Sequence, residues 1–137
     1  MHRTTPCVGI CSTTYGDLIC RGCKRFAHEI VQWNGYDDDQ RDRVWRRLGE
    51  LRDGSVAQFV TREQIDALVA RAEELNLPPG RTTTPQAIAY EVLRRMVLRP
   101  LPQADQGWAR ELLNRIDKEY FQRSRAHYER NFRIPSE

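Results

Sequence analysis

The chain has 137 residues, of which 39% are hydrophobic and 30% charged, and its formal net charge at pH 7 is +3. This length suits one ordinary domain or a small module with a second one, and the modest charge excludes a strongly basic nucleic-acid-binding protein. No stretch approaches the ~20 apolar residues that cross a bilayer, and no apolar signal segment precedes the first cysteine. We therefore expect a cytoplasmic protein, in which thiols stay reduced.

All four cysteines lie within the first 23 residues, in the pattern Cys7-x3-Cys11-x8-Cys20-x2-Cys23. Glycines between them permit tight turns, so the four thiols can converge on one point. Paired thiolates with short spacers form the tetrahedral sites that zinc and iron–sulfur clusters prefer. We therefore expect these four cysteines to be metal ligands. A disulfide framework is the weaker alternative, because the expected compartment is reducing.

Local structure around the cysteines is expected to be a small hairpin followed by a helix. Residues 11–13 and 18–20 could pair as short extended pieces around the turn between them, which would bring the two cysteine pairs together. From Lys24 to Trp33 the apolar residues recur at helical spacing, which predicts the first helix.

The second predicted helix begins at the capping box Asp37-x-x-Gln40 and ends at about Arg52, because Asp53-Gly54 follows. Residues 55–60 are ambiguous between a short extended piece and a helical turn. A boundary near this segment would divide the chain into a four-cysteine metal-binding module with two helices, residues 1–53, and a C-terminal helical region, residues 54–137.

Three more helices are predicted beyond that boundary, over residues 61–76, 84–99 and 105–132. The first opens with the capping box Thr61-x-x-Gln64, and the second has Pro85 at its first position. The expected fold class is therefore mainly α, with an N-terminal four-cysteine metal knuckle followed by about five helices.

The last predicted helix interleaves basic and aromatic side chains, a pattern that can hold phosphates and stack on bases. Residues 105–137 also contain six acidic residues, however, so their net charge is only +1. Some of these acids stand four residues before an arginine, as Glu111 does before Arg115, and such pairs stabilise the helix itself. An amphipathic core helix is favoured over a nucleic-acid site.

The cysteine pattern argues against catalysis. Four thiolates close the coordination shell, whereas a zinc enzyme keeps one position open. No Ser-His-Asp arrangement, phosphate-binding glycine loop or His-Glu-x-x-His motif is present. His28 follows Cys23 by five residues, but with four thiols available it is not needed as a ligand. Arg21, Lys24 and Arg25 flank the second cysteine pair and would favour its thiolate form.

The cysteine segment resembles a small bacterial family called domain of unknown function 1289, often labelled "predicted iron–sulfur protein". The residues that carry the resemblance are Pro6-Cys7-Val8-Gly9-Ile10-Cys11, then Cys20-Arg21-Gly22-Cys23-Lys24-Arg25, then Glu29-Ile30 and Trp33. The resemblance covers about residues 5–52 and implies that the four cysteines fill the four cysteine positions of the family. It implies nothing about residues 53–137.

Cysteine spacing favours zinc without deciding the metal. Structural zinc sites use spacers of two to four residues within each pair, whereas ferredoxin-type clusters use other spacings. A single compact segment with no bulky apolar shell also protects a redox cluster poorly. The leading hypothesis is a non-enzymatic protein with a structural zinc knuckle, acting as an adapter for another protein or for nucleic acid. The alternatives are an iron–sulfur protein in electron transfer or redox sensing, and a metal-free redox dithiol. A nucleic-acid-binding protein is a lesser alternative.

Overall fold

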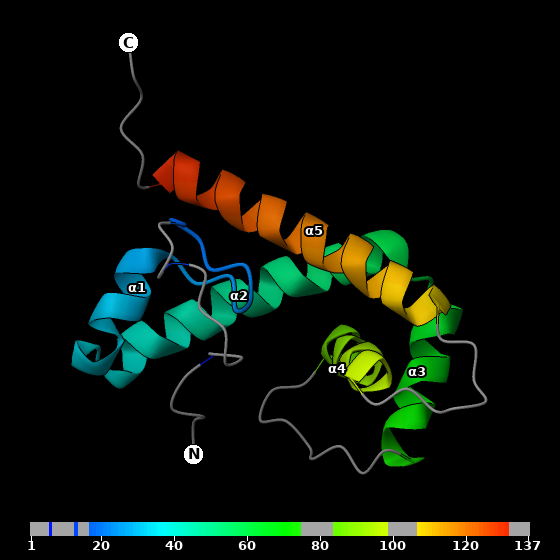
Figure 1. Ribbon diagram of the computed structural model, residues 1–137. Coiled ribbons are helices and arrows are strands. Elements are labelled where there is room, and N and C mark those ends of the chain that lie inside the picture. The colour runs from blue at the N-terminus through cyan, green and yellow to red at the C-terminus, as the bar shows by residue number, and fades with distance from the viewer. Residues whose placement is uncertain (1–5, 7–12, 14–16, 75–83, 99–106, 132–137) are drawn as a thin grey trace. The chain divides into compact units, whose positions relative to one another are not determined.

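The computed structural model describes residues 6, 13, 17–74, 84–98 and 107–131, which are mainly helical (Figure 1). This confirms the predicted mainly α fold class, while the four-cysteine metal knuckle stays a prediction. The helices of the described residues are α1 (Ala27–Gln32), the short 3-10 helix η2 (Trp33–Gly35), α2 (Asp38–Phe59), α3 (Arg62–Glu74), α4 (Pro85–Leu98) and α5 (Gly107–Asn131).

The first helix begins later than its apolar spacing predicts. Lys24 has a φ of 67°, in the left-handed region, and Phe26 forms an isolated antiparallel bridge with Ile19. Residues 24–26 therefore belong to a loop, and α1 begins only at Ala27. The predicted hairpin is not tested, because residues 11 and 12 lie outside the described residues.

The predicted end of the second helix at Arg52 is wrong. Helix α2 continues through Asp53 and Gly54 and ends at Phe59, so the ambiguous segment 55–60 is helical for nearly its whole length. A glycine inside a helix costs about 1 kcal/mol relative to alanine. The burial of Val56 and Val60, which both lie in a hydrophobic core, offsets this cost.

Both predicted capping boxes are confirmed. The Asp37 N–H donates to Gln40 Oε1 at 2.9 Å, and the Gln40 N–H donates to Asp37 Oδ1 at 2.8 Å. The Thr61 N–H donates to Gln64 Oε1 at 2.8 Å, and the Gln64 N–H donates to Thr61 Oγ1 at 3.2 Å. Each pair satisfies backbone donors that the first turn of a helix leaves unpaired.

The chain forms two compact units. The first contains residues 1–51 and 120–137, and the second contains residues 52–119, so α2 and α5 each have residues in both. The predicted division into domains 1–53 and 54–137 stays a prediction. The first unit differs from the predicted module in that it includes the C-terminal part of the last helix.

Each unit has its own hydrophobic core. The core of the first unit is formed by Trp33, Val44, Leu48 and Tyr120. In the second unit α3 packs against α4, and α5 contributes residues such as Ile116 to the core. None of the helices in the described part of the chain is long and apolar enough to cross a membrane.

Candidate metal centre

Two of the four predicted ligands, Cys20 and Cys23, lie in the described part of the chain. Their exposed fractions are 1% and 7%, so both thiols are buried. Cys7 and Cys11 lie outside the described residues. Among the residues that are described, no three His, Cys, Asp or Glu side chains come together as a metal site. The predicted set of four ligands therefore stays a prediction.

Both thiols project from a tight turn, residues 20–25, which we call the cysteine loop. The Cys20 N–H donates to the Arg25 carbonyl at 2.9 Å, and the Lys24 N–H donates to the Cys20 carbonyl at 2.8 Å. The buried Lys24 ammonium donates to the carbonyls of Arg21 and Gly22 at 2.7 and 3.1 Å. These bonds offset the cost of a left-handed backbone at a residue other than glycine. The loop is thus held closed by its own backbone and by one lysine.

The sequence predicts that basic neighbours favour the thiolate form, but in the structure two opposing effects act on the pKa of Cys23. The Arg25 Nε–H donates to Cys23 Sγ at 3.3 Å, an interaction that lowers the pKa of this thiol. Burial has the larger effect, however, and the pKa of Cys23 is raised above its ordinary value. A metal binding here must therefore displace a proton from sulfur.

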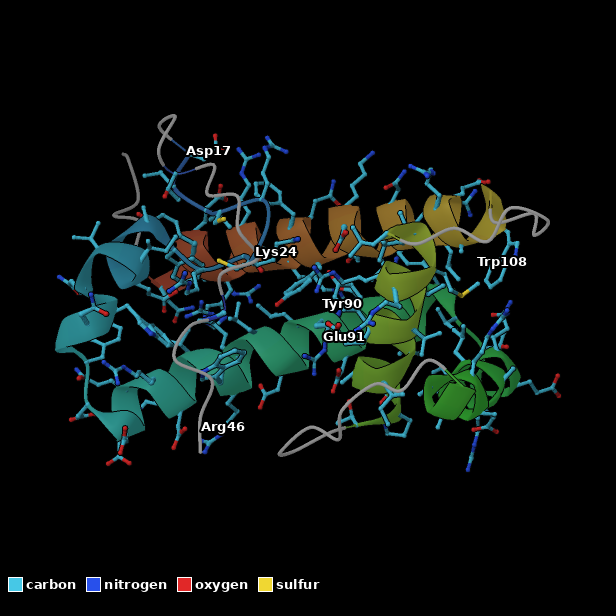
Figure 2. All side chains as sticks on the ribbon, turned by 60° about the horizontal axis from the view of Figure 1, so that its bottom comes forward. Asp17, Lys24, Arg46, Tyr90, Glu91 and Trp108 are labelled. Carbon is cyan, nitrogen blue, oxygen red and sulfur yellow. The ribbon has the colours of Figure 1, made fainter. Side chains whose placement is uncertain are left out.

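The C-terminal part of α5 covers the cysteine loop. The Lys24 ammonium lies 5.0 Å from the ring centroid of Tyr120, and the Arg21 guanidinium lies 4.7 Å from that of Phe121. Figure 2 shows Lys24 beside the orange turns of this helix. Sequence reasoning missed this contact, although the aromatic residues of α5 are its visible signal. The alternation of these aromatic residues with arginine by itself favours an amphipathic core helix.

Phe26, directly after the cysteine loop, is held from three sides. Its N–H donates to Glu29 Oε1 at 2.9 Å, and its ring meets the edge of the Tyr128 ring with centroids 4.9 Å apart. The Arg47 guanidinium lies 4.0 Å from the Phe26 ring centroid and also pairs with Glu29, with 2.7 Å between Nη2 and Oε1. These contacts fix the position of Phe26, and therefore of the C-terminal end of the cysteine loop.

A hollow of about 460 Å³ lies beside the cysteine loop, and its lining includes Arg21 and Phe121. Two ion pairs stand in this lining, Arg21 with Asp17 at 3.5 Å and Arg125 with Glu129 at 3.3 Å. Each arginine is thus balanced by a carboxylate, so the lining has no excess positive charge for a phosphate backbone. This balance argues against the hypothesis that α5 binds nucleic acid.

The described part of the site defines a class: a helical protein with a buried Cys-x2-Cys loop covered by a distant helix of its own chain. Residues 5–52 match the model of a family described as "Protein of unknown function (DUF1289)". The resemblance expected from the cysteine segment is thereby confirmed over these residues, and residues 53–137 lie outside the match. No curated protein and no solved structure matches the chain.

Proposed function

We propose that this is a non-enzymatic metal-binding protein in which Cys7, Cys11, Cys20 and Cys23 hold zinc in a closed, structural site. The observation that carries the proposal is the pair of buried thiols on a loop closed by its own hydrogen bonds. Sulfur donors with a two-residue spacer fit zinc, and Arg25 places a cation against one of them. The donor set therefore suits the metal.

The role proposed for zinc is to order the N-terminal segment. This segment has few apolar residues of its own, and a structural zinc site contributes on the order of 10–16 kcal/mol at neutral pH. When bound, zinc supplies a crosslink between the two cysteine pairs without redox chemistry. A protein ordered in this way suits an adapter that presents a fixed surface to another protein.

An iron–sulfur cluster is the second candidate, and one observation favours it. The sequence predicts no bulky apolar shell around the cysteines, yet Ile19 and Phe26 are both buried next to them, and Tyr120 of α5 is buried against Lys24. Such a shell excludes water, which is one of the factors that set the potential of a cluster. The function would then be electron transfer or redox sensing, with reversible reduction as its signature.

Metal analysis of protein purified without oxygen tests the proposal. We expect a colourless preparation with one zinc per chain, lost in Cys20→Ser because a hydroxyl is a poor zinc ligand. His28→Gln is the matched control: it alters a neighbouring side chain that could bind metal, and we expect it to keep all of its zinc. Visible sulfur-to-iron absorption together with acid-labile sulfide would show that the bound group is an iron–sulfur cluster and not zinc. A protein with no metal at all would refute both candidates.

A further inference from the structure

Arg25 is a buried cation at the end of the cysteine loop. Its exposed fraction is 4%, and its guanidinium forms no ion pair with an Asp or Glu of the described part of the chain. A charge taken out of water without an opposite charge is unfavourable. A buried arginine without a carboxylate therefore points to another group that carries negative charge when the protein is in its working state.

The side chain of Arg25 is directed at one sulfur. Its Nε–H donates to Cys23 Sγ at 3.3 Å. Its guanidinium carbon lies 5.1 Å from the ring centroid of Trp33, which is buried in the core of the first unit. Its carbonyl accepts from the Cys20 N–H at 2.9 Å, so its backbone is held by the loop as well. These three contacts fix the cation against the sulfur of Cys23.

The other two basic residues of the loop have different surroundings. The Lys24 ammonium donates to two carbonyls of the loop, at 2.7 and 3.1 Å. The side chain of Arg21 is 69% exposed and pairs with Asp17 at 3.5 Å. An exposed charge is screened by water and salt, whereas a buried charge acts strongly on a neighbouring atom. Arg25 combines burial with a direct hydrogen bond to sulfur.

Metal binding would supply the negative charge that Arg25 requires. A free thiol is largely uncharged at neutral pH and accepts only weakly, whereas a metal-bound sulfur is a thiolate. Four thiolates on one zinc ion leave the site with a net negative charge. We propose that Arg25 is the charge partner of the metal-bound Cys23 thiolate, through the Nε–H hydrogen bond already present. This inference rests on the proposed metal site and makes Arg25 a positioning residue that sets its affinity.

Arg25→Met in the full chain tests the inference, with zinc and cobalt as the probes. Methionine keeps much of the length of the side chain but removes the charge and the donor. In competition with a chelator, we expect the affinity for zinc to fall about 10- to 100-fold, as is typical when the partner of a metal ligand is lost. In the cobalt-loaded protein, the sulfur-to-metal charge-transfer band should move to longer wavelength, because the cation lowers the energy of the thiolate lone pair.

Two further variants separate charge from packing. Arg21→Met is the matched control: it removes an arginine of the same loop whose side chain is exposed, and it should leave both readouts unchanged. Arg25→Lys keeps the charge but not the planar donor group. We expect it to lose less affinity than Arg25→Met and to have a band between those of Arg25→Met and the unaltered protein. Packing alone would not move the band.

An unchanged affinity and band in Arg25→Met would overturn the inference alone. Equal losses of affinity in the methionine and lysine variants, with the band of the unaltered protein, would do the same. If Arg25→Met does not fold, Arg25→Lys decides: a band at longer wavelength supports the inference, and an unmoved band contradicts it. An unaltered protein that binds neither zinc nor cobalt would overturn the inference and the proposed zinc site together.

Discussion

Arg47 links α2 to the segment that follows the cysteine loop. Both of its terminal nitrogens donate to the two oxygens of Glu29, and its guanidinium carbon lies over the Phe26 ring, 4.0 Å from the ring centroid. The exposed fractions of the two charged side chains are 13% and 5%, so the pair is largely removed from water. A bidentate pair of this kind restricts both partners to one geometry. Arg47 therefore positions the residues on which the cysteine loop ends.

We expect Arg47→Met to lower the free energy of unfolding by about 3–5 kcal/mol, because it leaves the buried Glu29 carboxylate without its cation. Urea unfolding followed by circular dichroism measures the loss. The matched control is Arg94→Met, which removes an ion pair with Glu91 whose side chains are 31% and 53% exposed. Exposed pairs contribute about 0–1 kcal/mol. Equal small losses in the two variants would show that the Arg47 pair is not a structural anchor.

The start of α4 shows how one capping residue joins two helices. The Thr84 Oγ1 accepts from the Ala87 N–H at 3.0 Å and donates to Asp53 Oδ2 at 2.8 Å. Asp53 lies within α2 and also accepts from Arg52 Nε at 3.0 Å. The cap of α4 is therefore also its connection to α2, within the second unit.

Thr84→Ala should cost about 2 kcal/mol of unfolding free energy, because it removes a helix cap and one hydrogen bond to a charged group. Thr61→Ala at the start of α3 removes a cap of the same residue type, and we expect a loss of about 1 kcal/mol. Thermal or urea unfolding of the two variants gives the comparison. If the losses are equal, the bond to Asp53 adds nothing to stability.

Sequence patterns predict these helices better than they predict their ends. The capping boxes at Asp37 and Thr61 could be predicted from the sequence because both partners lie within one helical turn. The predicted end at about Arg52 was wrong because Val56 and Val60, beyond Asp53-Gly54, are buried in the core of the second unit. Only tertiary structure reveals this burial, so the local Asp-Gly pattern indicates a helix end that does not occur.

In the candidate site, too, the local pattern could be predicted from the sequence, whereas the tertiary contacts could not. The cysteine spacing predicts a metal site directly, and two of the four predicted ligands are described, both buried. The turn at Lys24 could not be predicted, because glycine is the usual sign of a left-handed residue. The contact of Tyr120 with Lys24 could not be predicted either, since it depends on α5 returning to a loop about a hundred residues earlier in the chain.

At the scale of the whole molecule, the two units should respond differently to loss of metal. The first unit contains the cysteine loop and has a small core, whereas the second has a larger core of its own. After chelation we expect faster amide exchange in residues 17–26 and also in residues 120–131, which cover the loop. Residues 61–74 and 84–98 should keep their protection, because local opening does not require their core to separate.

Hydrogen-exchange mass spectrometry measures this pattern once metal removal has been verified. Cys20→Ser is the control, since a chain that holds no metal should not respond to the chelator. An exchange pattern that is unchanged by metal removal would contradict a structural role for the metal. A rise that is just as large in α4 would contradict the independence of the two units.

The division of α5 between the units also has a consequence for biosynthesis. The second unit is continuous in sequence, so all of its residues have been made before the last helix is finished. The first unit also contains the C-terminal part of α5, which is translated after the whole of the second unit. Domains at the start of a chain usually fold first during translation. Here the cysteine loop is translated before the second unit, but Tyr120, which contacts the loop, is translated after it, so the second unit can fold before the first is complete.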